Sequence, residues 1–193
     1  IRIGDWSSDV CSSDLMYLAQ GAIISLDLGK GHIIDKDTSD DLKEKIQRTI
    51  LYFFKKEVDK NNLKLIDFTP YNKFFISNGE KLKSIVKRVN RSESDLHITL
   101  NINFSKSNEI FCFVEEFDSK GKKFAENICS FFELINYKNK GIKESDVYNL
   151  LYIDKPSIII DLNLNINDES EVDEKGECIA KTLVESILSL GTK

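Results

Sequence analysis

The chain has 193 residues, of which 41% are hydrophobic and 31% charged, and its formal net charge is −5. This length and apolar content suffice for one globular domain with a buried core. The mild acidic balance argues against a nucleic-acid-binding protein, which normally needs a clustered basic face. No apolar run is long enough to span a membrane.

The first fifteen residues, Ile1–Leu15, differ from everything that follows. They are rich in Ser and Asp, contain the only tryptophan, Trp6, and resemble the translation of a common sequencing-library adapter. A methionine, Met16, follows directly. We therefore interpret residues 1–15 as an adapter or assembly artefact, and we expect one domain over residues 16–193.

From residue 22 onward, segments of strand length alternate with segments of helical periodicity. The predicted strands are Ala22–Leu28, Leu63–Phe68, Asp95–Ser105, Glu109–Glu115 and Ser157–Leu162. The predicted helices run from the capping residues Thr38–Asp40 to about Asp59, from about Gly79 to Arg91, from about Gly121 to Ile135, and through Ile179–Ile187. We expect a short strand or turn at Val147–Ile153. This alternation predicts an α/β three-layer sandwich, in which helices flank a mostly parallel or mixed twisted sheet.

The longest predicted strand, Asp95–Ser105, has two chemically different faces. Apolar residues alternate with polar ones at period two, and the polar side includes His97, Asn101 and Asn103. In open α/β sheets, ligands bind at the carboxyl ends of the strands. The amides near the end of this strand are therefore candidate ligand-binding groups. We interpret His97, which lies further back, as a buried and hydrogen-bonded imidazole.

Two other residue groups predict ordinary structural roles. Cys112, Cys129 and Cys178 are far apart in the sequence and lie in apolar surroundings, so we expect buried, reduced thiols rather than disulfides or a zinc–thiolate site. The second predicted helix carries a basic cluster, which we interpret as its solvent-facing side. The cluster consists of Lys81, Lys83, Lys87, Arg88 and Arg91.

Two blocks of the sequence carry a resemblance to a known family. RVNRSESDLHITLNINFS, at Arg88–Ser105, matches a helix ending in R-x-N followed by a D-L strand with a histidine-x-asparagine tip. GIKESDVYNLLYIDKPSIIIDL, at Gly141–Leu162, matches a G-x-K and tyrosine-containing segment, then a Lys-Pro strand ending in a carboxylate. In these blocks the chain resembles the zinc-dependent N-acetylmuramoyl-L-alanine amidases of clostridial phage endolysins and autolysins. These enzymes cut the bond between the lactyl group of the glycan and the first alanine of the peptidoglycan stem.

The resemblance implies a site whose metal ligands are replaced in this chain. The family's zinc ligands, histidine, glutamate and histidine, fall on Lys30, Ser39 and Asn101, and its general-base glutamate falls on Asp161. A lysine ammonium has no lone pair to donate, and serine and asparagine are poor zinc ligands. We therefore expect no zinc and no other cofactor, and we treat Asp161 as the candidate catalytic position. We further expect Lys30 to pair with Asp161 in place of the metal.

An alternative keeps the metal. His32 lies two positions after the expected histidine, so a bulged loop with a nearby aspartate would let it replace the lost ligand. The chain would then be a divergent active amidase, with zinc bound and Asp161 as the base. We favour His32 as an exposed loop residue, because the alternative needs two compensating shifts.

The expected function is that of an inactive amidase-like protein, acting as a wall-binding or regulatory module. Its partners would be the peptidoglycan glycan or stem peptide, or an active hydrolase, with no nucleic acid. The ligand-binding candidates are Asn103, Asn163 and Asn167, whose alternative role is that of ordinary loop amides. No export signal is visible, so the expected location is the cytoplasm until lysis, or the cell wall.

Overall fold

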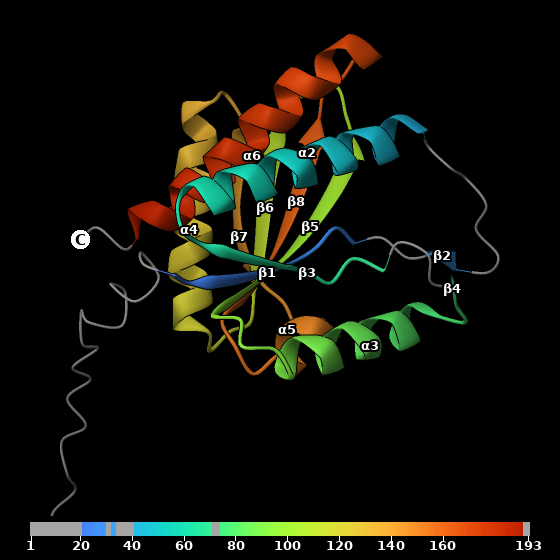
Figure 1. The fold of residues 1–193 in the computed structure, drawn as a ribbon, viewed down its shortest axis with the longest axis vertical. Helices are drawn as coiled ribbons and strands as arrows, with labels where there is room; N and C mark the ends of the chain where they lie inside the picture. The colour runs from blue at the N-terminus through green and yellow to red at the C-terminus, as the bar shows by residue number, and fades with distance from the viewer. Residues whose placement is uncertain (1–20, 30–31, 34–40, 71–73, 191–193) are drawn as a thin grey trace, which may run out of the picture.

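The computed structural model describes residues 21–29, 32–33, 41–70 and 74–190, with the backbone alone at residues 32, 33 and 74. Within them, helices lie on both faces of a central sheet (Figure 1). The predicted α/β three-layer architecture is therefore confirmed. Among these described residues, no helix is both long enough and apolar enough to cross a membrane.

Six of the described strands form one mixed sheet, in the order β3-β1-β5-β8-β6-β7. β1, β3, β5 and β8 are parallel, β6 runs antiparallel to β8, and β7 runs parallel to β6. The continuous apolar run of β8 is explained by its central position between β5 and β6. The bounds are β1 Ile23–Asp27, β3 Lys64–Asp67, β5 Leu96–Phe104, β6 Glu109–Val114, β7 Lys138–Glu144 and β8 Ser157–Leu164.

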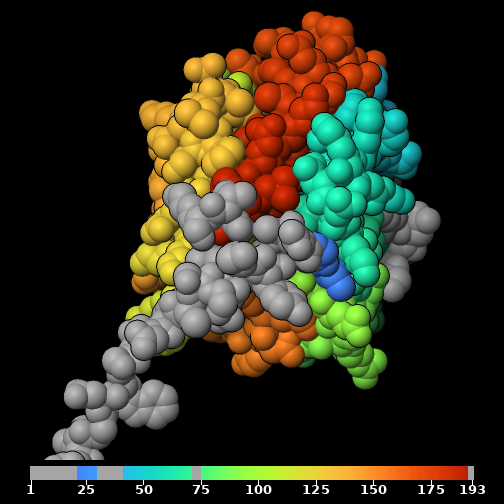
Figure 2. All heavy atoms as spheres, turned by 60° about the vertical axis from the view of Figure 1, so that its left-hand side comes forward, coloured from blue at the N-terminus to red at the C-terminus, as the bar shows by residue number. Residues whose placement is uncertain are grey.

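The helices divide between the two faces of this sheet. α2 (Asp41–Lys60), α4 (Ser119–Leu134) and α6 (Val172–Ser189) cover one face, and Figure 2 shows α6 lying between α2 and α4. The main core lies beneath them and takes the apolar side of every long strand, including Ile98 and Leu100 of β5. α3 (Asn78–Asn90) and α5 (Tyr148–Tyr152) lie on the opposite face, over a smaller cluster (Figure 1). The polar side of β5 faces this second, thinner layer.

Three local predictions need correction. β7 was not predicted, because it is an edge strand whose residues are mostly lysine, asparagine and glutamate. Val147–Ile153 was expected to form a strand or turn, but it contains the one-turn helix α5. His32 was expected in a loop, but its backbone belongs to the two-residue strand β2 (His32–Ile33), which pairs with β4 (Phe74–Phe75).

Candidate functional site

Two candidate residues meet at the centre of the sheet. Asn101 of β5 and Asp161 of β8 are register partners, and the Asn101 amide Nδ2 donates a hydrogen bond to Oδ1 of Asp161 at 2.7 Å. Both side chains point toward the α3–α5 side and are partly exposed. The pair therefore presents one carboxylate, already held by an amide, in the carboxyl-terminal half of two parallel strands.

The loop after β1 closes tightly over this pair. Gly29 has a φ of +64°, and a Cβ atom placed on it would overlap Oδ1 of Asn101. Lys81 of α3 donates from Nζ to the Gly29 carbonyl at 2.9 Å, and Gln47 of α2 donates to the Leu28 carbonyl at 3.1 Å. Glycine is required at position 29 both for its left-handed backbone and for this close approach.

Replacing Gly29 with alanine is expected to destabilise the fold by about 2 kcal/mol, because both the backbone and the contact with Asn101 become strained. Urea unfolding measures this change. Gly21→Ala is the matched control, because Gly21 also has a positive φ, of +84°, but a Cβ atom placed on it would meet no other atom within 4 Å. It should cost about 1 kcal/mol. Equal losses in the two variants would show that the contact with Asn101 contributes nothing.

A buried carboxyl group, Asp27, lies at the end of β1. It is 2% exposed, and its Oδ1 accepts a hydrogen bond from the Gly29 N–H at 3.2 Å. Burial raises the pKa of Asp27 from 3.8 to about 7, while the positive charge of Lys81 acts in the opposite direction. Burial also lowers the pKa of Lys81, and Asp27 opposes that shift. The only feature of the sequence that could have indicated this buried carboxyl group is its position, as a single aspartate at the end of an apolar strand.

Comparison with solved structures decides the type of fold. The catalytic domain of endolysin CD27L, which targets Clostridia difficile, matches with a TM-score of 0.73 at 21% identity, over 87% of this chain and 97% of that one. An N-acetylmuramoyl-L-alanine amidase from Clostridium difficile 630 matches with a TM-score of 0.69 at 19% identity, over 88% and 96%. The fold is that of the N-acetylmuramoyl-L-alanine amidases.

Three further comparisons complete this result. The amidase CwlD from Clostridioides difficile, solved in complex with the GerS lipoprotein, matches with a TM-score of 0.61 at 17% identity, over 89% of this chain and 96% of that one. No protein-family model matches the sequence, and no curated protein matches it. The likeness to the amidases is therefore one of fold, at 17–21% sequence identity in these three structures.

The amidase-like positions predicted from the sequence are only partly covered by the structure. Asn101 and Asp161 are described and are in contact, whereas Lys30 and Ser39 lie outside the described residues, as does the side chain of His32. The expected Lys30–Asp161 pair therefore stays a prediction. In the part of the chain that is described, no three His, Cys, Asp or Glu side chains group closely enough to hold a metal ion.

The other candidate amides fall in two different places on the amidase fold. Asn103 and Asn163 are register partners beside the Asn101–Asp161 pair, and Asn163 donates to Oε2 of Glu109 at 3.4 Å. Asn167 lies beyond the end of β8, where its backbone and side-chain N–H groups both donate to Oε1 of Glu171. Asn103 and Asn163 thus extend the polar surface around Asp161. Asn167 instead stabilises the turn before α6 through its hydrogen bonds to Glu171.

His97 belongs to a buried network rather than to this surface, which confirms the interpretation from the sequence. It is 1% exposed, with Nδ1 2.9 Å from the Ser25 hydroxyl and Nε2 3.3 Å from the Thr99 hydroxyl. Asn149 of α5 in turn donates to Thr99 at 3.2 Å. Burial lowers the pKa of His97 to about 3, so the ring is neutral and carries one N–H. The network ties α5 to the sheet.

The basic cluster of α3 also departs from its expected solvent-facing role. Lys81 reaches the β1 loop, and the Arg88 guanidinium donates to the Phe68 carbonyl at 3.0 Å and lies 4.8 Å from the centre of the Phe68 ring. Lys83, Lys87 and Arg91 are exposed as predicted. Lys81 and Arg88 therefore bind α3 through hydrogen bonds to the loops that follow β1 and β3.

The cysteines differ from one another. Cys112 and Cys129 are buried with their sulfur atoms 3.5 Å apart, whereas Cys178, which was expected to be buried, is exposed on α6. The fourth cysteine, Cys11, lies in residues 1–15 and is removed by the substitution Cys11→Ser. In that variant, a thiol reagent should label only Cys178 quickly. Labelling of Cys112 and Cys129 should require unfolding. Mass spectrometry after brief and denaturing labelling measures this, and rapid native labelling of two or more thiols would contradict the packing of α4 on β6.

Proposed function

We propose that this chain is a peptidoglycan-associated protein that has lost amide hydrolysis and acts as a wall-binding or regulatory module. The observation that carries the proposal is the hydrogen bond from Asn101 to Asp161, at the positions where the resemblance puts a zinc ligand and the general base. The Asn101 N–H donates to the Asp161 carboxylate and so occupies one of its acceptor oxygens. An amide N–H neither activates water nor binds a cation. The Asn101–Asp161 pair thereby supports ligand binding rather than catalysis.

The side chains at the other ligand positions support the same conclusion. A catalytic zinc ion takes about three nitrogen, sulfur or carboxylate donors and one water. Lysine at position 30 brings a positive charge, and serine at position 39 brings a weakly donating hydroxyl. With an amide at position 101, this set does not fit zinc, and no hydrolytic step is assigned to it.

A peptidoglycan fragment is the ligand class that best suits the remaining surface. Asn101, Asn103 and Asn163 offer amide donors and acceptors, and Asp161 offers a carboxylate, for the hydroxyl and amide groups of a glycan or stem peptide. The similarity to an endolysin catalytic domain supports a wall ligand. The similarity to an amidase solved with a lipoprotein supports a second role, binding a protein partner such as an active hydrolase.

The decisive experiment combines three measurements on the purified chain. We expect less than about a tenth of an equivalent of zinc after incubation with excess metal, no release of stem peptide from cell walls, and saturable binding to purified peptidoglycan. About one equivalent of zinc with peptide release would instead establish the alternative, an active amidase that uses His32. Neither zinc nor wall binding would leave only the role as partner of a hydrolase.

A site variant tests where the wall ligand binds. Asn163→Asp places a second negative charge beside Asp161 and replaces an amide donor with an acceptor, so wall binding should weaken at least fivefold. Asn127→Asp is the control, because Asn127 lies on α4 on the other face of the sheet and interacts with Ser186 and Ser189 of α6. Binding to peptidoglycan in a sedimentation assay measures both. An equal loss in the two variants would mean that the Asn101–Asp161 surface is not the binding site.

A further inference from the structure

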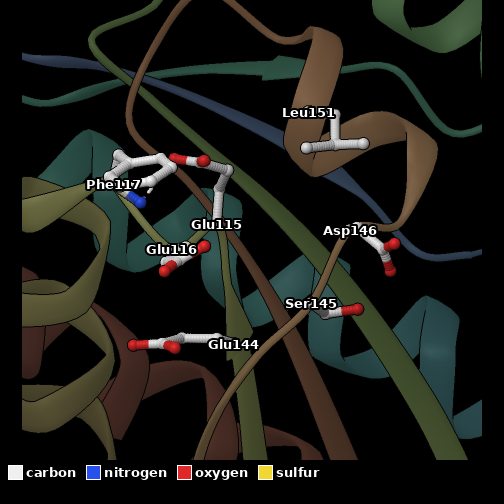
Figure 3. A pocket seen from close by; sticks show the side chains of 7 residues that line it. All are labelled: Glu115, Glu116, Phe117, Glu144, Ser145, Asp146 and Leu151. Atoms are coloured by element: carbon white, nitrogen blue, oxygen red, sulfur yellow. Dashed lines mark hydrogen bonds between the residues drawn. The ribbon is translucent and has the colours of Figure 1, made fainter.

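A second surface feature lies just after the carboxyl end of β6, beside α5. It is a groove of about 380 Å³ at the point where β6 and β7 end. Figure 3 shows Glu115, Glu116 and Phe117, from the segment after β6, across the groove from Leu151 of α5. Phe111 of β6 pairs with Asp161, and Glu115 lies four residues further along, which is about 13 Å at the rise of a strand. The groove is therefore separate from the Asn101–Asp161 pair.

The charged side chains that line this groove are all acidic. They are Glu115, Glu116, Glu144 and Asp146. Glu144 lies 3.7 Å from Lys122 in an exposed ion pair, which contributes little. Glu116 and Asp146 have no ion pair among the residues that the structure describes. Four carboxylates without a basic residue in the lining create a negative potential that a cationic ligand would relieve.

Apolar side chains separate these carboxylates. Phe117 is 82% exposed and Leu151 is 47% exposed. A neighbouring hollow of about 450 Å³ shares Glu115, Phe117 and Leu151 with the groove, but its lining also includes the basic residues Lys120 and Lys155, so the wholly acidic lining is confined to the groove itself. A single exposed apolar residue is ordinary, but a phenylalanine and a leucine facing each other across a groove form an apolar contact point.

We propose that this groove binds a basic peptide segment of a partner protein. Lysine or arginine side chains of that segment would lie over Glu116 and Asp146, and one apolar side chain would insert between Phe117 and Leu151. Charge complementarity selects the partner and accelerates association, while the apolar contact supplies affinity. This inference does not depend on the proposed wall-binding function, because it uses different residues and a different class of ligand.

The test uses the full chain and a fluorescein-labelled nonapeptide of alternating lysine and leucine, with anisotropy as the readout. The peptide should bind saturably, and raising NaCl from 50 to 300 mM should weaken binding at least fivefold. The double variant Glu116→Lys with Asp146→Lys should weaken it at least tenfold. Phe117→Ser should weaken it at least threefold, and its high exposure makes loss of folding improbable as a cause.

The matched control reverses two carboxylates on helices of the opposite face, Asp59→Lys on α2 and Glu126→Lys on α4. It changes the net charge by the same amount, so it should weaken binding less than threefold if the groove is the site. Equal weakening in both double variants would overturn the proposal, as would equal binding of a peptide with glutamate in place of lysine. Displacement of the peptide by a soluble peptidoglycan fragment would reassign the groove to the wall ligand and would also overturn it.

Discussion

The free energy of unfolding is expected to fall by about 4 kcal/mol as the pH rises from about 4 to about 7, and Asp27→Asn should remove most of that fall. Burial raises the pKa of Asp27 from 3.8 to about 7. Between these two pH values, the folded chain keeps a proton that the unfolded chain has lost. Each pH unit in that window therefore costs about 1.4 kcal/mol of stability, and the contribution of Asp27 is constant below and above it.

Charged groups near Asp27 also shift its pKa and therefore change the pH dependence of the free energy of unfolding. Lys81 and Arg88 favour its charged form, whereas Asp67 disfavours it. The lowered pKa of Lys81 affects stability in the opposite sense, and it does so only between that lowered pKa and the ordinary value of 10.5. Asparagine at position 27 has nearly the same shape as the protonated acid and cannot ionise. The difference between the two proteins therefore isolates Asp27.

Urea unfolding at pH 4.5, 5.5, 6.5 and 7.5, with similar m-values required throughout, measures the slope. Asp67→Asn is the control, because Asp67 lies at the same edge of the sheet but is more exposed than Asp27, and it should leave most of the slope in place. An unchanged slope in Asp27→Asn would mean that Asp27 is ionised in the folded chain across this range. A slope lost equally in both variants would assign the effect to the cluster as a whole.

The elements that periodicity predicted well are those with a large buried face. β5 was predicted because its apolar residues alternate without interruption, and all four from Leu96 to Ile102 are buried. β7 escaped prediction because an edge strand on the surface needs only one inward apolar residue, Ile142, and its sequence otherwise resembles a loop. α5 is too short for helical periodicity to be visible, and tertiary contacts such as that of Asn149 with Thr99 hold it in place.

The contact between the two described candidate residues was not predictable from the sequence. The sequence placed Asn101 and Asp161 near the ends of neighbouring strands, but it did not contain the register that makes them hydrogen-bonding partners across 60 residues. The basic cluster of α3 was misread for a related reason. Helical periodicity tells which residues share a face, but only the docking of α3 beside β1 brings Lys81 to Gly29. Asp27 was missed because a single carboxylate at the end of an apolar strand has no partner in the local sequence.

The second large effect concerns zinc. Replacing Lys30 with His, Ser39 with Glu and Asn101 with His should raise bound zinc from less than about a tenth of an equivalent to about one. The triple variant restores three donors of the kind that a catalytic zinc ion takes, and it removes a positive charge from the site. Asn101→His also breaks the hydrogen bond that holds Asp161, which frees the carboxylate. Elemental analysis after gel filtration measures the bound metal.

The single variant Asn101→His is the control for this reconstruction. One added histidine supplies too few donors, so it should bind less than a third of an equivalent, and the increase should come only with all three changes. A triple variant that folds but binds no more zinc than the parent would show that positions 30 and 39 do not meet position 101, and the assignment of the ligand positions would then be wrong. Stem-peptide release by the zinc-loaded triple variant would go further. It would show that the amidase fold here still places Asp161 where a base can act, and that the loss of the metal ligands alone separates this chain from an active enzyme.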